Sequence, residues 1–287
     1  MRIKAYAKVN LALKVVNKRD DNYHNLQTIM DLIDIYDVVR IKRHNAILFE
    51  CSDKNLENNN NLVLKAIDEL KKYCNLNESH GAKIFLKKHI PYGAGLGGGS
   101  SDAASTLIAL NKIWKLELTF EELVKIALKV GSDVPFFLLS QRGILSGIGE
   151  NVNAIDSNLK LYYLLINPKY PMYTKDVYMN NKVYGDNFDS IDNMIKAFNS
   201  NFVDEVINNM FNDLTDSAIS LNNDEPKIKD IIDKANNVIN EYKITGKAIM
   251  SGSGSSVVCA FTNKADRDLI FNQLNNHFQS IIRAASI

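Results

Sequence analysis

Residues 91–104 read Pro91-Tyr92-Gly93-Ala94-Gly95-Leu96-Gly97-Gly98-Gly99-Ser100-Ser101-Asp102-Ala103-Ala104, with five glycines within seven residues. Glycines leave backbone N–H groups uncovered by side chains. The apolar helical pattern that follows adds unpaired first-turn amides and the positive end of a helix dipole. Such a loop binds anions, most often phosphate. A flexible linker is the other interpretation of a glycine run, but a proline and a packed helix frame this one. The sequence therefore predicts a phosphate-binding loop.

Three well-known phosphate-binding motifs do not fit this stretch. Gly93, Gly95 and Gly98 satisfy G-x-G-x-x-G, but the series of strand–helix units that a dinucleotide-binding domain requires does not follow. The Gly-Lys-Ser or Gly-Lys-Thr of a P-loop is absent from the sequence. The H-R-D and D-F-G signatures of protein kinases are absent as well.

The loop instead resembles the second of three motifs of the GHMP kinases. Ala7-Lys8-Val9-Asn10-Leu11 resembles the first motif and Met250-Ser251-Gly252-Ser253-Gly254 the third. The motifs stand in the family's order, and the similarity runs from residue 5 to about residue 262. Tyr23-His24 and the segment Gly131-Ser132-Asp133-Val134-Pro135-Phe136-Phe137 resemble the branch of the family that phosphorylates a cytidylated alcohol.

The fold class follows from the order of the expected elements. The pattern predicts a strand with a buried and a polar face at 3–15, strands at 36–42, 46–51 and 82–90, and helices at 61–73, 101–114 and 119–130. In the second half it predicts helices at 189–199, 202–212, 225–241 and 264–276, and strands at 143–147, 161–166, 246–250, 256–262 and 280–286. Because strands and helices do not alternate regularly, the class is α+β. The resemblance implies a two-lobed GHMP kinase fold, with residues 1–153 as the N-terminal lobe, 154–287 as the C-terminal lobe and the active site in the cleft between them.

The resemblance also implies an activity. It implies an ATP-dependent kinase, a phosphotransferase with an alcohol group as acceptor. Its acceptor would be the 2-hydroxyl of 4-diphosphocytidyl-2-C-methyl-D-erythritol and its product the 2-phosphate, in non-mevalonate isoprenoid biosynthesis. Two alternatives stay open: another GHMP kinase, such as a homoserine kinase, and a non-catalytic binding protein with this fold.

Phosphoryl transfer requires that the phosphates are held, their charge neutralised and the acceptor hydroxyl deprotonated. The expected ATP-binding residues are Pro91, Tyr92, Gly93, Ala94, Gly95, Leu96, Gly97, Gly98, Gly99, Ser100 and Ser101, mainly through backbone N–H groups between Gly95 and Ser101. A Mg²⁺ ion is expected on the ATP phosphates, with no protein residue predicted as its ligand.

Two residues are expected to be catalytic. Asp133 is the expected base on the family pattern, although an aspartate at this spacing is also typical of a turn or a helix cap. Pro135 should hold the backbone at 133–134 extended and keep a helix from resuming after Gly131. Lys8 is its expected partner, although a lysine on the polar face of a strand is usually only solvated.

Five residues are expected to bind the substrate. A cytosine ring needs aromatic faces and a group that reads its hydrogen-bonding edge. The resemblance assigns these roles to Tyr23 and His24, and Thr174-Lys175-Asp176-Val177-Tyr178 resembles a family element whose aromatic residue covers the other face of the ring. The expected substrate-binding residues are Asn10, Tyr23, His24, Thr174 and Tyr178.

Composition limits the remaining function classes. The 287 residues carry a net charge of +1, with 46% hydrophobic and 23% charged residues, typical of a soluble globular protein. The basic residues do not form a run, so neither nucleic acid nor a membrane surface is an expected partner. Cys51, Cys74 and Cys259 are odd in number and far apart, which fits a reducing cytoplasm. A small-molecule substrate, a cytoplasmic location and a monomer or weak homodimer are the expectations.

Overall fold

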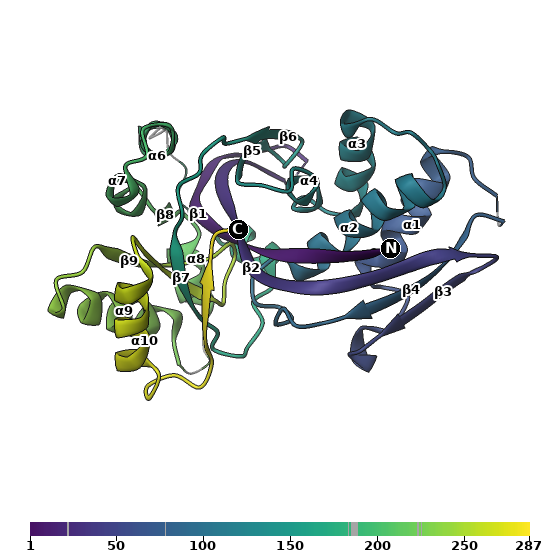
Figure 1. The fold of residues 1–287 in the computed structure, drawn as a ribbon. Helices are drawn as coiled ribbons and strands as arrows, with labels where there is room; N and C mark the ends of the chain where they lie inside the picture. Colours follow the sequence, from purple (N-terminus) through teal and green to yellow (C-terminus); the bar gives the residue numbers. More distant parts are fainter. Residues whose placement is uncertain (22, 78, 183, 185–188, 223, 225) are drawn as a thin grey trace.

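The computed structural model describes residues 1–287 except 22, 78, 183, 185–188, 223 and 225. Its strands form two sheets that lie beside each other, each with its own helices (Figure 1). Helices and strands are segregated rather than alternating, so the α+β class is confirmed.

The larger sheet is built on two long antiparallel strands, β1 (Arg2–Lys18) and β2 (His24–His44). Its order is β3-β4-β2-β1-β8, and β5 and β6 continue from a second stretch of β2. The β3–β4 and β1–β8 pairs are parallel and the other pairs antiparallel. The remaining strands are β3 (Ile47–Cys51), β4 (Gly81–Lys87), β5 (Gly143–Gly147), β6 (Asn151–Ala154) and β8 (Phe211–Asn212).

Three helices cover one face of this sheet, and a fourth short one follows them (Figure 1). They are α1 (Leu62–Tyr73), α2 (Gly98–Ile113), α3 (Phe120–Val130) and α4 (Val134–Leu138), and a 3₁₀ turn lies at Lys54–Leu56. Asn61 caps α1 through the Val63 amide, and Thr119 and Glu122 form a reciprocal capping box on α3. Apolar side chains of α1, α2 and α3 close a core against β2 and β4.

The smaller sheet is antiparallel in the order β11-β7-β10-β9. One face packs against α9 and α10, and the other against α6, α7 and the β1 side chains of Ala7, Val9 and Leu11. Its strands are β7 (Tyr162–Ile166), β9 (Gly246–Met250), β10 (Val257–Phe261) and β11 (Ile281–Ala285). The helices of this half are α5 (Thr174–Met179), α6 (Asp189–Asn199), α7 (Val203–Asn208), α8 (Thr215–Leu221), α9 (Ile228–Glu241) and α10 (Lys264–Leu274).

Buried polar contacts join the two sheets. Asp31 of β2 accepts hydrogen bonds from Arg142 at 2.9 Å, Tyr163 at 2.6 Å and Ser286 at 2.8 Å. Since Tyr163 lies in β7 and Ser286 follows β11, one buried carboxylate connects both sheets. A core cluster also contains residues from both halves, so the lobe boundary between 153 and 154 stays a prediction.

Some local expectations are wrong. The first strand is not half-solvated, because Lys8, Asn10 and Lys14 are 3%, 3% and 5% exposed. The glycine loop, the loop at 251–254 and the side chains of Asp133 and Asp213 contact its polar face. The segment 202–212 is a helix only to Asn208, since Phe211–Asn212 pair with β1. The sequence pattern also gave no sign of β6, α4, α5 or α8, all short elements.

Candidate active site

The glycine loop lies between β4 and α2 and continues into the helix. Gly97 caps α2 in the left-handed conformation (φ 71°), and the helix begins at Gly98. A Cβ at position 97 would stand 2.6 Å from the Phe137 ring and 3.0 Å from Cγ of Lys8. The loop therefore needs glycine here for its backbone angle and for its contact with protein, not only for room beside a phosphate.

The residues of the loop differ in what they expose. Ala94 and Leu96 are buried in the core, so they face no ligand with their side chains, whereas Tyr92 is 78% exposed. The Leu96 carbonyl accepts the Lys8 amide at 3.0 Å, which ties the loop to β1. The Ser101 amide donates to the Gly97 carbonyl at 2.9 Å. Ser101 can therefore bind an anion only through its hydroxyl group. Pro91, Gly93, Gly95, Gly98, Gly99 and Ser100 are partly or fully exposed along the same loop.

Lys8 and Asp133 lie next to each other, although 125 positions separate them in the sequence (133 minus 8). The Lys8 Nζ to Asp133 Oδ2 distance is 3.4 Å, and the Lys8 ammonium also donates to Asn10 Oδ1 at 2.6 Å. The Lys8 side chain is 4% exposed and that of Asp133 42%. A buried ammonium is thus held against a carboxylate that remains open to solvent and ligands.

Asn10 is fixed in the orientation that Lys8 needs. Its Nδ2 donates to Thr28 Oγ1 at 2.8 Å, and Thr28 in turn donates to the Ala12 carbonyl at 2.8 Å. The Thr28 hydroxyl proton is thereby committed, so the amide must present its N–H to Thr28 and its oxygen to Lys8.

The backbone at Asp133 is not extended, so the conformation expected there is wrong. Asp133 has φ −85° and ψ −12°, and it precedes the short helix α4, with Pro135 in the first turn. Proline is accepted in a first helical turn because its missing N–H would have no intrahelical partner there. The Asp133 side chain makes no capping hydrogen bond, which leaves its carboxylate to Lys8.

The third motif meets the other two. The Asn10 amide donates to Ser251 Oγ at 3.2 Å. A Cβ on Gly95 would lie 2.8 Å from the Ser251 carbonyl, and a Cβ on Gly252 would lie 3.3 Å from Lys8 Nζ. All three motifs therefore converge on the Lys8 ammonium.

Of the expected substrate-binding residues, Asn10 lies beside Lys8, and His24 and Tyr178 lie beside each other. His24 is 7% exposed and its ring centroid lies 5.5 Å from that of Tyr178, whereas Tyr23 is 63% exposed. Thr174 and Ser253 join α5 to the third motif through their hydroxyls, 2.9 Å apart. Burial, and secondarily the nearby Lys18, lowers the pKa of His24, so this ring is neutral near pH 7.

The aromatic group adjoins the ion pair. Burial and, secondarily, the negative charge of Asp133 raise the pKa of the Tyr178 hydroxyl. The sequence did not single out Tyr184, whose ring stacks on His24 at 6.0 Å and whose hydroxyl lies 3.4 Å from His24 Nε2. No motif surrounds Tyr184 in the sequence, so the residue pattern gave no reason to expect it in the site.

A buried charge cluster behind the glycine loop was also not expected. Lys88 Nζ donates to Asp102 at 2.8 Å and to Asp37, and Asp37 also accepts the amides of His89 and Ile90. The loop is thus anchored at its start by Asp37 and at its end by Asp102 of α2. Burial by itself would lower the pKa of Lys88. The nearby Asp102 and Asp37 have the larger, opposite effect, so the pKa of Lys88 is raised.

Asp102→Asn is expected to change the pH dependence of stability. Burial raises the pKa of Asp102 from 3.8 to about 8, so the folded protein keeps a proton that the unfolded chain loses between these values. The stability of the parent therefore falls as pH rises from about 4 to 8. The difference in melting temperature, variant minus parent, should increase by roughly 2 °C or more from pH 5 to pH 9. The same exchange at the exposed Asp204 is the control. If the melting temperatures of the parent and of Asp102→Asn changed with pH in the same way, the raised pKa of Asp102 would be contradicted.

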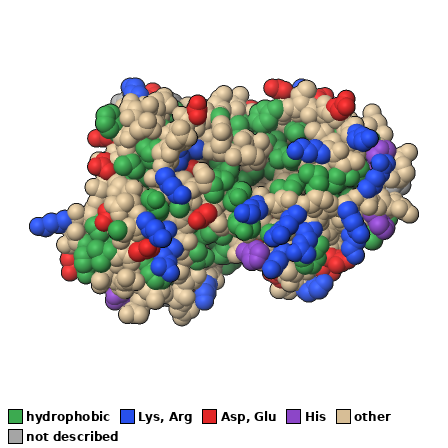
Figure 2. Space-filling model, viewed as in Figure 1, with side chains coloured by type: hydrophobic (Ala, Val, Ile, Leu, Met, Phe, Trp, Pro, Cys, Tyr) green, Lys and Arg blue, Asp and Glu red, His purple; other side chains and the backbone are tan. Residues whose placement is uncertain are grey.

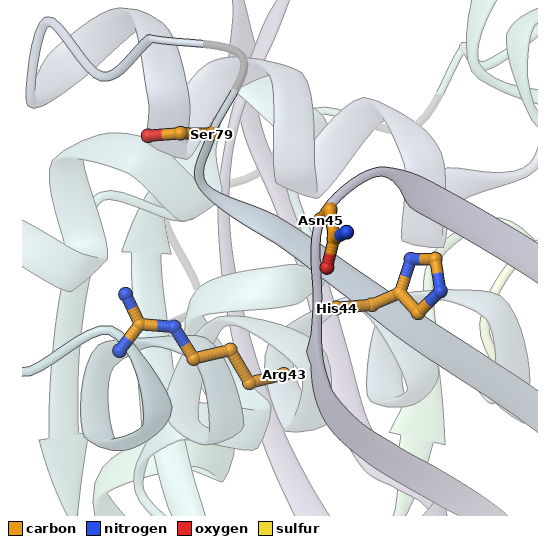
Figure 3. Close-up of a pocket in the computed structure, with 4 residues that line it drawn as sticks. All are labelled: Arg43, His44, Asn45 and Ser79. Atoms are coloured by element: carbon orange, nitrogen blue, oxygen red, sulfur yellow. The ribbon is translucent and has the colours of Figure 1, made fainter.

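Two surface cavities lie away from the three motifs. One is lined by Arg43, His44, Asn45 and Ser79 at the far end of the larger sheet, with these side chains spread apart around it (Figure 3). The other is lined by residues such as Gln141, Asp156 and Ile287 near the C-terminal end. On the face drawn in Figure 2, positive, negative and hydrophobic side chains are interspersed. Among the described residues, no group of three or more His, Cys, Asp and Glu could hold a metal ion, and no described helix could span a membrane.

Comparison with known proteins gives matches over nearly the whole chain. The family model "GHMP kinases N terminal domain" matches residues 61–141, and "GHMP kinases C terminal" matches residues 194–280. A 4-diphosphocytidyl-2-C-methyl-D-erythritol kinase of Caldanaerobacter subterraneus subsp. tengcongensis is 38% identical over 92% of this chain and 88% of its own length. A protein of the same name from Clostridium beijerinckii is 33% identical over the full length of both chains.

Solved structures agree in fold. A crystal structure of a 4-(cytidine 5'-diphospho)-2C-methyl-D-erythritol kinase superposes with a TM-score of 0.79 at 25% identity, over 99% of this chain and 98% of that one. A mevalonate kinase of L. major superposes with a TM-score of 0.74 at 16% identity, over 100% of this chain and 95% of that one, and is similar in fold alone.

Proposed function

The chain belongs to the 4-diphosphocytidyl-2-C-methyl-D-erythritol kinases of the GHMP kinase family, and we propose that its own site carries out that reaction. The protein transfers the γ-phosphoryl group of ATP to the 2-hydroxyl of 4-diphosphocytidyl-2-C-methyl-D-erythritol. The observation that carries the proposal is the Lys8–Asp133 pair, 3.4 Å apart, beside two glycine loops.

The glycine loop binds the phosphates of ATP. Its exposed backbone donors at Gly98 to Ser100 open helix α2, where the helix dipole favours negative charge. Loop 251–254 contacts Gly95 from the other side, so both loops can approach one phosphate chain. A Mg²⁺ ion would supply positive charge to the phosphates, and the described part of the chain offers it Asp133 but no cluster of carboxylates.

Asp133 accepts the proton of the acceptor hydroxyl. Its carboxylate is solvent-accessible and lies 3.4 Å from the Lys8 ammonium, so a hydroxyl bound beside the pair can reach it. The same ammonium stabilises the negative charge that develops on the attacking oxygen. Asn10 holds Lys8 in place through its Oδ1.

Tyr23, His24, Thr174 and Tyr178 bind the cytidylated end of the substrate. His24 is neutral and can present one donor and one acceptor to a base edge. Tyr178 offers a ring face beside His24 and adjoins Asp133, which links base recognition to the ion pair.

The test is ADP release from ATP with three acceptors. We expect kcat/KM for the cytidylated alcohol to exceed that for homoserine and for mevalonate by about a hundredfold or more. Comparable turnover of homoserine would favour the alternative kinase. The binding-protein alternative predicts no ADP release with any acceptor.

The same assay on Tyr178→Ala locates the base-binding surface. The KM for the cytidylated alcohol should rise about tenfold, since stacking a base on an aromatic ring contributes roughly 1–3 kcal/mol. The KM for ATP should stay within about twofold, because the variant leaves the glycine loop intact. Tyr173→Ala, an exposed tyrosine just before α5, is the matched control. Equal losses for both substrates would indicate general destabilisation instead.

We also propose a cytoplasmic location. Its support is that Cys51, Cys74 and Cys259 are free, two of them buried, as in reducing compartments. A monomer or weak homodimer, without nucleic-acid or membrane partners, stays a prediction.

A further inference from the structure

We propose that Asn212 is a positioning residue that sets the third glycine loop, residues 251–254, in front of Lys8. The residue lies in β8, outside the three motifs that carry the family resemblance. The inference rests on the proposed function, because it assigns Asn212 a part in aligning that reaction.

The Asn212 side chain uses both of its N–H donors on backbone carbonyls at the loop. Its Nδ2 donates to the Met250 carbonyl at 2.8 Å and to the Gly252 carbonyl at 2.8 Å. Its Oδ1 accepts the Leu214 amide at 3.0 Å, which fixes the orientation of the amide group. One side chain thus holds the chain on both sides of Ser251.

The backbone of Asn212 is attached to the strand that carries Lys8. Asn212 pairs with Leu13 in the parallel β1–β8 ladder, and the next amide, that of Asp213, donates to the Leu13 carbonyl at 2.9 Å. Strand β8 and the Asn212 side chain therefore connect β1 to the loop by hydrogen bonds.

The loop in turn limits the space beside Lys8. Gly252 has φ 59°, and a Cβ added there would stand 3.3 Å from Lys8 Nζ and 3.3 Å from Asn10 Oδ1. A displacement of the loop by about 1 Å would change the position of its backbone relative to the ammonium. Misplacement on this scale can cost about a hundredfold in rate.

Asn236 offers a matched control. Its Nδ2 donates to the Ala248 carbonyl at 3.1 Å and its Oδ1 accepts the Ala248 amide at 2.9 Å. It is the same residue type bound to the same strand, β9, but at a point before the loop begins. Asn212 makes three side-chain hydrogen bonds and Asn236 makes two, so a purely structural role predicts that any loss of kcat follows the loss of melting temperature in both pairs.

The experiment measures kcat, both KM values and melting temperature for Asn212→Asp, Asn212→Ala, Asn236→Asp and Asn236→Ala. Asn212→Asp keeps the size of the side chain but faces two carbonyl oxygens without a proton to donate. We expect kcat to fall by about tenfold to a hundredfold in the Asn212 variants and by less than about threefold in the Asn236 variants. The melting temperature should fall somewhat further in the Asn212 variants, which lose three side-chain hydrogen bonds against two, but all four variants should stay folded at the assay temperature. If Asn212→Asp does not fold, Asn212→Ala, which brings no repulsion, decides the comparison.

A second readout does not depend on activity. The Gly254 amide donates to the Ser251 carbonyl at 3.1 Å within the loop, and its hydrogen exchange should accelerate in the Asn212 variants alone. Equal kcat and equal exchange in the two variant pairs would overturn the inference. If the parent and the Asn236 variants show no kinase activity, the proposed function fails, and the exchange result alone decides whether Asn212 holds the loop.

Discussion

Asp133→Asn is expected to lower kcat by about three orders of magnitude while ATP still binds. Asparagine has nearly the same size, but its amide cannot accept the proton of the acceptor hydroxyl. Its Nδ2 or Oδ1 would stand where a carboxylate now lies 3.4 Å from the Lys8 ammonium, so the favourable charge pair is lost as well. General-base catalysis contributes about 10²- to 10⁴-fold in comparable reactions.

Steady-state kinetics with the cytidylated alcohol and calorimetric titration of ATP check this prediction together. The control is Asp268→Asn, which changes a partly exposed carboxylate paired with Arg267 away from the three motifs and should leave kcat within about twofold. A kcat for Asp133→Asn within tenfold of the parent would remove Asp133 from the role of base.

Lys8→Met is expected to lower kcat by about 10²- to 10³-fold. Methionine has a comparable length and suits a buried strand position, but it carries no charge to stabilise the attacking oxygen. The Lys8 side chain is 4% exposed, so solvent cannot replace the ammonium at that place. The loss should fall on kcat more than on KM, because the interaction strengthens as charge develops in the transition state.

Lys14→Met separates this effect from a general effect of removing a buried lysine. Lys14 lies on the same strand, is 5% exposed and pairs with Asp213 at 3.6 Å, so the two exchanges remove the same kind of group. We expect Lys14→Met to keep kcat within about threefold, with a change in melting temperature similar to that of Lys8→Met. If both variants lost activity equally, the loss would reflect the packing of β1 and not catalysis by Lys8.

Much of the architecture could be predicted because it depends on neighbours in sequence. The glycine run and its helix, the Asn61 cap and the Thr119–Glu122 capping box use contacts within a few residues. Their physics is local, so the residue types and spacing specify them. The order of the three motifs likewise identifies the family without any knowledge of the fold.

Other predictions failed where a distant contact overrode the local pattern. The alternation at 3–15 predicts a strand with one solvated face, but the two glycine loops, Asp133 and Asp213 contact that face and make Lys8 an internal ammonium. Pro135 suggests an extended chain, but it can also occupy the first turn of a helix, and α4 forms in the core. Short elements such as β8 gain their stability from pairing with β1 and have no pattern of their own.

The sequence alone determined the family and singled out the residues that we propose carry the chemistry: the glycine loop, the lysine of the first motif and the aspartate before Val134-Pro135. Only the tertiary structure decided that Lys8 is buried 3.4 Å from Asp133, that Asp102 and Asp37 share Lys88, and that Asn212 holds the loop at 251–254. The reason is the length of chain between partners. The Asn10 amide and Ser251 Oγ stand 3.2 Å apart in space but 241 positions apart in sequence, and no local preference can encode such a contact.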